Sequence, residues 1–504
     1  MQFVVNHVFY AVGLFIVITL TSCKDETETN DSSLSSIPFI SDGYPSVTID
    51  GEFRYGYSVS MGDTVNFHIN AVEPYAGDIS VTDIQGKVIT VVNGVIYPQQ
   101  TTTERPWEQG FGYDVSFKLN IDDKFRTGVY LINGQEELFF VVKSSTNEEP
   151  IIAVIPTNTM NAYSCHGGHS AYSCSGADPK PRLSFLRPLT QMPQYVWEVS
   201  NFNMIIPTLT WLHQTSGYKD NIQYITDHEM LNIDKYKDAQ VLMILGHNEY
   251  WSIAAQQAFE RYIAQGKDSI ILGGNIMWWN SRYEENQTVQ VSHKSMSVDE
   301  NYYDQPTYRL HQIGFSAEER IGALFEYGGY DKNEWSGIVE KGANPMKVLV
   351  PESPILFGTE FNLCDPIDMG AHHEMDGPPL LGFDRNGFPV VNREKLNGVH
   401  QYEILAYTWG YRLGHTIGTV HAFKKYENSG SVLQYASNGS VKFALNASTK
   451  TQFEIMLKNS IQVLLDGDYP FSQNFLANDV VHKLETPYGG ELEYKDKIAV
   501  CFGK

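Results

Sequence analysis

Four short, mostly apolar segments constrain the fold of this chain more than any other feature. Residues 151–155 read IIAVI and residues 241–245 read VLMIL, and the segments IQYIT (222–226) and SIIL (269–272) are similar. A strand without polar alternation is typical of a parallel sheet that helices cover on both faces. The pattern therefore predicts four strands of one buried sheet.

Helical patterns connect these strands. Residues 253–265 repeat apolar side chains at helical spacing, with Ser252 as a plausible N-cap and Gly266 as the stop. A second helix is expected around 203–215, with Pro207 near its start. Strand, helix and strand in succession form a βαβ unit, so we predict an α/β fold with a doubly wound, mostly parallel sheet.

Further patterns outline the limits of this domain. A strand at 431–436 and an amphipathic helix at 452–465 close it, so the domain is expected to span 150–466. Residues from about 280 to 430 are irregular and rich in Tyr, Gly and Pro, and we interpret them as insertions on the same core. Residues 467–504 are a weakly patterned C-terminal tail.

Residues 43–146 follow a different pattern. Short β-branched segments such as TVNFHIN (64–70) and ELFFVV (137–142) are separated by turn residues. This spacing predicts an all-β, immunoglobulin-like sandwich that precedes the α/β domain.

The N-terminus is typical of an exported protein. An apolar run from 8 to 20 is short for a membrane span, and it leads into LTSC, which resembles a bacterial lipobox. We therefore expect a lipoprotein signal peptide at 1–23, lipidation of Cys23, and a flexible tether at 24–42. The expected location is the outer membrane or cell surface, with the lipid as membrane anchor. The alternative is a plain signal peptide or an uncleaved anchor.

Charge and cysteine content narrow the partners and the compartment. The formal net charge of −23 excludes nucleic acid as a partner, because phosphate binding needs a basic face. In an oxidising compartment Cys165 and Cys174 could form a disulfide, and the pairing of Cys364 and Cys501 is left open. Zinc binding by the first pair together with His166 and His169 is disfavoured, because adjacent ligands strain a tetrahedral site.

Polar or aromatic residues follow all four predicted strands. They are Asn158, Asn161 and Tyr163 after the first strand, Asp227 and His228 after the second, His247, Asn248, Glu249 and Tyr250 after the third, and Asn275, Trp278 and Trp279 after the fourth. An open parallel sheet binds its ligand at the carboxyl ends of its strands. We therefore expect a functional cleft at this edge.

The turn after the third strand, GHNEYWS at 246–252, indicates the class of chemistry. A strand-to-helix turn presents its first residues at the edge of the sheet, as in hydrolases with a nucleophile elbow. This turn has no Ser or Cys at its centre, so a covalent serine or cysteine mechanism is disfavoured. An imidazole, a carboxylate and a phenol can instead ligate a metal or move protons.

Several motifs in order resemble one known family, the proteins similar to the C-terminal domain of the N,N-dimethylformamidase large (beta) subunit. The motifs are GHNEYWS, PTNTMNAY…GGHSAY (156–172), SFLRP (184–188), YITDHEM (224–230), LGGNIMWW (272–279) and HHEMDG (372–377). The resemblance covers about 150–465. It implies a core like that of a class I glutamine amidotransferase, with a β-sandwich attached upstream.

The resemblance also implies an activity, amide hydrolysis with mononuclear non-haem iron held by two tyrosine phenolates and one glutamate. Phenolate is a hard anionic ligand that suits ferric iron. On this chain Tyr250 matches the tyrosine of the turn and Glu374 matches the acidic motif. Candidates for the second phenolate are Tyr163, Tyr283 and Tyr327, of which Tyr163 is preferred because it follows the first strand.

Four further residues are catalytic candidates. His372 could serve as a base or as a group that orients one, and Asn275 as a donor that polarises a carbonyl. His247 and Glu249 lie in the same turn as Tyr250. The alternatives are that Glu249 forms a salt bridge that fixes the turn and that His247 is a buried histidine with satisfied hydrogen bonds. Asp227 and His228 could likewise simply cap a helix.

Two other functions remain open at this stage. The first is a non-catalytic surface lipoprotein that binds carbohydrate or peptide, with Trp251, Trp278 and Trp279 as stacking surfaces. The second is a glycan hydrolase that uses Glu249 and Glu374 as paired carboxylates. The leading hypothesis is a surface-tethered, metal-dependent hydrolase of C–N amide bonds, which acts on a small amide or on a glycan or peptide. A small partner subunit or homo-oligomerisation is also expected.

Overall fold

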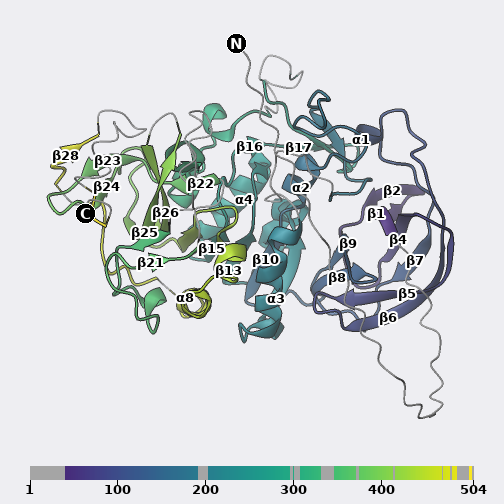
Figure 1. The fold of residues 1–504 in the computed structure, drawn as a ribbon, viewed down its shortest axis with the longest axis horizontal. Helices are drawn as coiled ribbons and strands as arrows, with labels where there is room; N and C mark the ends of the chain where they lie inside the picture. The colour runs from purple at the N-terminus through teal and green to yellow at the C-terminus, as the bar shows by residue number, and fades with distance from the viewer. Residues whose placement is uncertain are drawn as a thin grey trace, which may run out of the picture. The chain divides into compact units, whose positions relative to one another are not determined.

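The strands that begin at Ile40 form two sheets around a shared core (Figure 1). One sheet has the order β2-β1-β4-β7, from β1 (Ile40–Ile49), β2 (Glu52–Tyr55), β4 (Thr64–Ala71) and β7 (Phe117–Asn120). The other has the order β3-β9-β8-β5-β6, from β3 (Ser58–Val59), β5 (Tyr75–Asp83), β6 (Val88–Ile96), β8 (Gly128–Ile132) and β9 (Gln135–Val142). Val65, Phe67 and Ile69 alternate into the core and are fully buried.

The computed structural model describes residues 40–190, 202–295, 299, 307–330, 345–369, 374–412, 415–467, 469–476, 479–484 and 499–501. Cys23 and His372 therefore lie outside the described residues. No helix among the described residues is long and apolar enough to cross a membrane.

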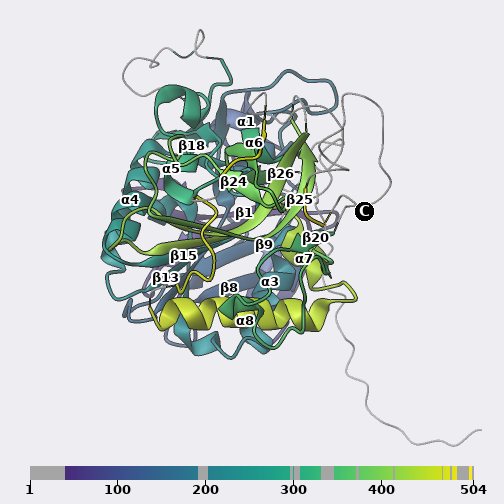
Figure 2. The same cartoon turned by 90° about the vertical axis from the view of Figure 1, so that its left-hand side faces the viewer.

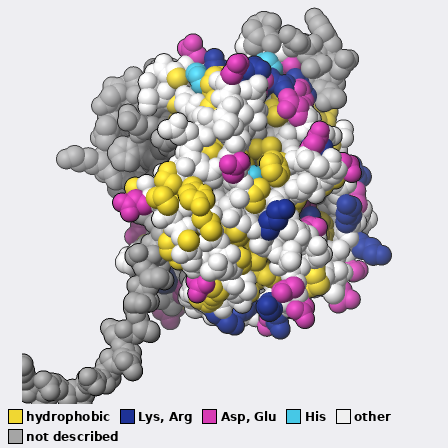
Figure 3. All heavy atoms as spheres, turned by 90° about the vertical axis from the view of Figure 1, so that its right-hand side faces the viewer, with side chains coloured by type: hydrophobic (Ala, Val, Ile, Leu, Met, Phe, Trp, Pro, Cys, Tyr) yellow, Lys and Arg dark blue, Asp and Glu magenta, His cyan; other side chains and the backbone are white. Residues whose placement is uncertain are grey.

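The sandwich carries more than half of the large apolar side chains that are exposed in the described part of the chain. On the edge strand β6, Val88 and Val91 are each 52% exposed and Val95 is 39% exposed. Figure 3 shows patches of hydrophobic side chains on the face turned to the viewer.

The second domain is built on one mixed sheet with the order β12-β10-β13-β15-β27-β26-β25-β19-β22. Its parallel half consists of β12 (Ile222–Thr226), β10 (Ile151–Ile155), β13 (Val241–Leu245), β15 (Asp268–Leu272) and β27 (Ser431–Tyr435). Its antiparallel half consists of β26 (His415–Lys424), β25 (Gln401–Tyr411), β19 (Gly329–Tyr330) and β22 (Glu374–Gly377), with β20 (Met346–Val348) and β21 (Pro366–Ile367) at the side.

Helices cover the parallel half on both faces. They include α2 (Thr157–Tyr163), α3 (Ile206–Gln214), α4 (Ile253–Ala264), α7 (Ser440–Ala444) and α8 (Lys450–Leu465), and the 3₁₀ segment η3 (Asp227–Lys235) follows β12. Figure 2 shows α4 and α8 on opposite sides of β13 and β15. The Ser252 hydroxyl accepts a hydrogen bond from the Ala255 amide, so the predicted N-cap of α4 is confirmed.

The remaining elements are short. They are α1 (Pro106–Gln109), α5 (Glu318–Ile321), α6 (Phe325–Gly328), β11 (Arg182–Ser184), β14 (Tyr250–Trp251), β16 (Trp279–Asn280), β17 (Arg282–Glu284), β18 (Val289–Val291), β23 (Leu380–Phe383), β24 (Pro389–Val391) and β28 (His482–Lys483).

The prediction of a doubly wound, mostly parallel α/β domain is wrong. Parallel pairing stops at β27, because β26 pairs with β27 antiparallel and the long hairpin β25–β26 continues in that sense. These strands come from the segment that we interpreted as insertions. Their sequences lack the uniform apolar character of β10 and β13, since buried Glu403, Thr408 and His421 interrupt them.

Two disulfides cross-link the chain. Cys165 pairs with Cys174, as the sequence suggested, and Cys364 pairs with Cys501 across a separation of 137 residues. The second bond ties the last described residues, 499–501, to the loop before β21.

Candidate active site

The turn after β13 is fixed by close packing. Gly246 has φ 61°, and a Cβ atom there would lie 2.7 Å from the Ile205 side chain, so only glycine fits without strain. The Thr159 hydroxyl, on α2, accepts a hydrogen bond from the Glu249 amide at 2.9 Å. The turn therefore presents His247, Glu249 and Tyr250 in a fixed order at the sheet edge.

The turn after β15 approaches β22 closely. A Cβ atom on Gly274 would lie 2.3 Å from the Ala436 carbonyl oxygen and 2.6 Å from that of Glu374, so glycine is required. Asn275 follows with φ 52°, a left-handed conformation that asparagine tolerates better than most residues. This approach brings Glu374 beside the turns that follow β13 and β15.

Glu249 is the centre of a buried cluster of phenols. The Tyr163 hydroxyl donates to its Oε2 at 3.0 Å, and the Tyr172 hydroxyl lies 3.2 and 3.0 Å from its two oxygens. The Tyr250 hydroxyl donates to the Tyr172 hydroxyl at 3.0 Å. The rings of Tyr163 and Tyr172 stack with centroids 4.1 Å apart. Three phenol oxygens and one carboxylate thus converge in a region from which solvent is largely excluded.

Glu374 joins this cluster through two side chains. Asn275 donates from Nδ2 to Glu249 Oε1 at 3.2 Å and to Glu374 Oε2 at 3.1 Å, so one amide links both carboxylates. His247 Nε2 lies 3.2 Å from Glu374 Oε2 and 3.6 Å from Glu249 Oε2. Asn438 also donates to Glu374 Oε2, at 3.0 Å.

Burial and charge perturb the titration of these groups. Burial and the charges of Glu249 and Glu374 raise the pKa of Tyr163 well above its ordinary value, and burial and Glu249 do the same for Tyr172. Burial raises the pKa of Glu249. Burial alone would lower the pKa of His247, but the hydrogen bond and charge of Glu374 outweigh it and the pKa is raised. The phenols are therefore protonated and donate to carboxylate.

The donor set fits a hard cation. In the described part of the chain no three His, Cys, Asp or Glu side chains are placed to bind a metal. Three phenols beside two carboxylates supply hard oxygen ligands of the kind that ferric iron accepts. A cation would have to displace the phenol protons on binding. The Asn275 Oδ1 atom is buried and has no hydrogen-bond partner in the described part of the chain, so one acceptor of this side chain is open toward the cluster.

Lys294 lies over the rim of the cluster. Its ammonium nitrogen is 3.1 Å from the centroid of the Tyr172 ring and 4.9 Å from that of Trp279. Burial lowers the pKa of Lys294 to about 7, although Glu249 and Glu374 oppose this shift.

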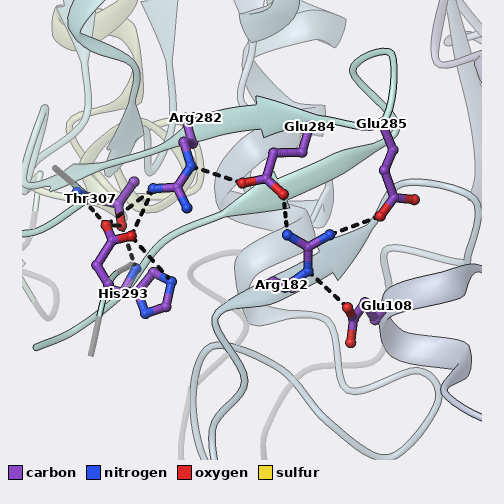
Figure 4. Close-up of polar contacts among 8 residues, drawn as sticks. Glu108, Arg182, Arg282, Glu284, Glu285, His293 and Thr307 are labelled. Carbon is purple, nitrogen blue, oxygen red and sulfur yellow. Dashed lines mark hydrogen bonds and ion pairs between the residues drawn. The ribbon is translucent and has the colours of Figure 1, made fainter. Parts of the chain in front are cut away.

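A polar network anchors the chain next to Lys294 (Figure 4). The His293 amide donates to the Thr307 hydroxyl at 3.1 Å, and Thr307 and Arg282 both donate to Asp299. Arg282 also donates to Glu284 at 2.9 Å. The network therefore ties the segment that carries Lys294 to β17.

Most of the predicted site residues meet in this cluster. They are Tyr163, His247, Glu249, Tyr250, Asn275 and Glu374. Tyr283 does not meet them, because its hydroxyl donates to Asn158 Oδ1 at 2.9 Å. The candidate base His372 lies outside the described residues.

Two of the alternative interpretations of the sequence are wrong: the capping role of Asp227 and the tryptophan stacking surfaces. Asp227 does not cap the following helix, because Thr226 and Glu229 form the capping box there. Its carboxylate instead accepts from the Asn158 amide at 2.8 Å. Trp251, Trp278 and Trp279 are at most 7% exposed, so they offer no open stacking surface for a glycan.

Sequence reasoning missed three members of the site. Tyr172 is the last residue of the GGHSAY motif, but no role was predicted for this tyrosine. Asn438 follows β27, a parallel strand that the sequence predicted, but no role was assigned to the residues after it. Lys294 follows β18, which belongs to a separate three-stranded sheet within the segment that we interpreted as insertions.

The Cys165–Cys174 disulfide closes the loop that carries Tyr172. In the chain-entropy model a loop of this length stabilises the folded state by about 2–3 kcal/mol. We expect Cys165→Ala/Cys174→Ala to lower the free energy of unfolding by about that amount, measured by urea denaturation. Equal stability with and without the bond would contradict this expectation. The bond also limits the positions that Tyr172 can adopt against Tyr163.

Comparison with known proteins identifies the family. A family model described as N,N-dimethylformamidase beta subunit-like, C-terminal, matches residues 69–459. The chain belongs to this family. The predicted resemblance is therefore confirmed, and the match begins within the sandwich rather than at residue 150. A search of curated proteins found no match to the chain. Membership of the dimethylformamidase-like family is consistent with a hydrolase of amides.

Proposed function

We propose that the chain is a metal-dependent hydrolase of C–N amide bonds. One observation carries the proposal. Two phenols, Tyr163 and Tyr172, donate to Glu249, and a third, Tyr250, donates to Tyr172, beside Glu374 and His247. Family membership supports the reaction class, and the tyrosine-rich donor set supports a hard metal. The proposed ligands are Tyr250, Tyr163 and Glu374, with mononuclear ferric iron as the metal.

The residues of the chain have separate proposed roles. Bound iron would supply Lewis acidity toward the amide carbonyl or a water molecule. His247, whose Nε2 lies 3.2 Å from Glu374, would accept and return a proton at that nitrogen. Asn275 holds Glu249 and Glu374 at a fixed separation, because its amide hydrogens already bond to both carboxylates. We therefore assign Asn275 to orientation rather than to carbonyl polarisation.

The proposed location is the cell surface. The lipobox-like LTSC and Cys23 support a lipid anchor, and they precede the described residues. Palmitate labelling of the wild-type protein and of Cys23→Ala in a bacterial host tests this proposal. Equal labelling of the two proteins would contradict it.

Tyr250→Phe tests the metal site. Elemental analysis of the purified wild-type protein should find about one iron per chain, with a visible phenolate-to-iron absorption band. We expect Tyr250→Phe to lower iron affinity at least about tenfold and to weaken the absorption band. Mutation of residues that only orient metal ligands already lowers metal affinity or activity by about 10–100-fold.

Tyr262→Phe is the matched control. Tyr262 is a buried tyrosine on α4, and its hydroxyl donates to the Ala239 carbonyl, so this variant should keep iron and colour. A wild-type protein that takes up no metal, or a Tyr250→Phe variant with full occupancy and colour, would overturn the assignment. Hydrolysis of a glycan by metal-free protein would favour the paired-carboxylate alternative.

A further inference from the structure

Two basic side chains, Lys294 and Arg309, contact the same tryptophan ring at the rim of the phenol–carboxylate cluster. The Lys294 ammonium is 4.9 Å from the centroid of the Trp279 ring, and the Arg309 guanidinium carbon is 5.5 Å from the same centroid. Arg309 is also 5.3 Å from the Trp278 ring. Both cations are partly exposed, whereas Trp278 and Trp279 are buried. The two charges thus share one aromatic neighbour at the boundary between solvent and site.

Neither cation forms an ion pair with a residue that the structure describes, although the charges of Glu249 and Glu374 act on Lys294. Within the described residues, Lys294 and Arg309 form no ion pair and donate no side-chain hydrogen bond, and the Arg309 Nε atom is buried without a partner. Two other arginines that stack on aromatic rings do form ion pairs. Arg320 pairs with Glu260 at 3.3 Å, and Arg412 pairs with Glu326 at 3.3 Å.

The charge of Arg309, which forms no ion pair with a described residue, is unfavourable in a partly desolvated site unless an anion neutralises it. The arrangement is more notable because the chain as a whole carries a net charge of −23. The charges of Glu249 and Glu374 lie close enough to affect Lys294, so a dianion such as phosphate would be repelled more strongly than a monoanion. A carboxylate also matches the planar donor fork of arginine.

We propose that Lys294 and Arg309 form an anion subsite that binds a carboxylate of the substrate. The inference rests on the proposed amide hydrolysis, and it narrows the substrate class to amides that carry a carboxylate near the scissile bond. Trp279 contacts both side chains, and Lys294 also contacts the ring of Tyr172 in the phenol cluster.

The test compares small probes that differ in charge. Binding of N-acetylglycine, its neutral analogue N-acetylglycinamide, glucuronate and inorganic phosphate is measured by calorimetry or by quenching of tryptophan fluorescence. We expect N-acetylglycine to bind at least tenfold more tightly than N-acetylglycinamide, with a preference that falls as ionic strength rises. Equal affinity for these two probes would overturn the proposal. Tighter binding of phosphate would overturn the carboxylate assignment, and tighter binding of glucuronate would overturn the amide assignment.

Variants test which residues produce the preference. Arg309→Met should abolish it, Arg309→Lys should retain part of it, and the matched control Arg320→Met should retain all of it. Retention of the full preference in Arg309→Met would exclude the subsite. If Arg309→Met fails to fold, Lys294→Met and the salt dependence of the wild-type protein decide the question.

The two proposals can fail separately. Binding is measured in chelator-treated and in iron-loaded protein, so the anion preference is observed without catalysis. A preference in a protein that never takes up metal would support the subsite and contradict the proposed function. An iron-loaded, coloured protein without the anion preference would support the metal site of the proposed function and contradict the subsite.

Discussion

Replacing Arg187 by methionine is expected to lower the free energy of unfolding by at least about 4 kcal/mol. Arg187 is fully buried in the SFLRP motif, and no carboxylate in the described part of the chain pairs with it. Burial lowers its pKa to about 9. Its stabilising effect must therefore come from the neutral acceptors around it.

Five backbone carbonyls surround the guanidinium. Nη1 donates to the carbonyls of Ser164, His166 and His169 at 3.1, 2.7 and 3.0 Å. Nη2 donates to the Asn161 carbonyl at 2.7 Å, and Nε to the Ser184 carbonyl at 3.0 Å. Methionine fills part of the volume but leaves these acceptors without a donor, and each buried unsatisfied group costs about 1–3 kcal/mol.

The substitution Arg187→Met should also disturb the positions of side chains in the candidate site. The carbonyls of Ser164, His166 and His169 belong to the loop between Tyr163 and Tyr172, so Arg187→Met should also release the stacked phenols from Glu249. Arg187→Lys should rescue little, because one ammonium cannot reach carbonyls that are spread around the edge of the planar guanidinium. Urea denaturation measures the stability, and iron uptake measures the site.

Arg182→Met provides the control (Figure 4). Arg182 lies only five residues earlier and pairs with Glu108, Glu284 and Glu285, but its side chain is 31% exposed. Exposed ion pairs contribute about 0–1 kcal/mol, so this variant should lose about 1 kcal/mol or less. A loss below about 2 kcal/mol in Arg187→Met, or an equal loss in both variants, would refute the argument.

The sequence predicted those parts of the fold that rest on local patterns. Uniform apolar runs gave β10, β13 and β15, and helical spacing with a capping serine gave α4. The hairpin β25–β26 was not predicted, because its buried polar residues have hydrogen-bond partners far along the chain. Glu403, for example, accepts from the Tyr469 hydroxyl at 2.7 Å and the Gln473 amide at 2.6 Å. A polar residue whose partner is distant looks like a surface residue in sequence.

The residues of the candidate site also divide into those that local sequence patterns predicted and those that distant segments contribute. Tyr163, Glu249, Tyr250 and Asn275 were predictable because each follows a strand of the parallel half, and such strand ends share one edge. Glu374 was predictable only through the family motif, since β22 reaches the cluster from the antiparallel half. The carboxylate-linking role of Asn275 and the cation at Lys294 required coordinates.

His228 should make the stability of the protein depend on pH. Its ring is 5% exposed and lies among the rings of Tyr55, Phe185 and Tyr283, with centroids 3.7, 4.6 and 4.4 Å away. Neither ring nitrogen has a hydrogen-bond partner among the residues that the structure describes. Burial lowers the pKa of His228 to about 3. The imidazole is therefore neutral in the folded protein throughout the ordinary pH range.

The sign of the effect follows from this shift. The unfolded chain protonates the histidine near pH 6.5, whereas the folded chain does not until the pH reaches about 3. The stability contribution is thus fully present above pH 6.5 and is lost as the pH falls toward 3. The loss is about 1.4 kcal/mol per pH unit, or about 2 kcal/mol between pH 7 and pH 5 and about 5 kcal/mol at most.

His228→Leu should remove this dependence, because leucine has a similar volume and does not titrate. Buried Asp227, whose pKa burial raises, has the opposite dependence on pH, so the informative quantity is the difference between variant and wild type. Urea denaturation from pH 7 to pH 5 should show the variant losing about 2 kcal/mol less than the wild type. His400→Leu, at an exposed position, should follow the wild type. Parallel curves for His228→Leu and the wild type would mean that His228 is already protonated or reaches solvent in the folded state.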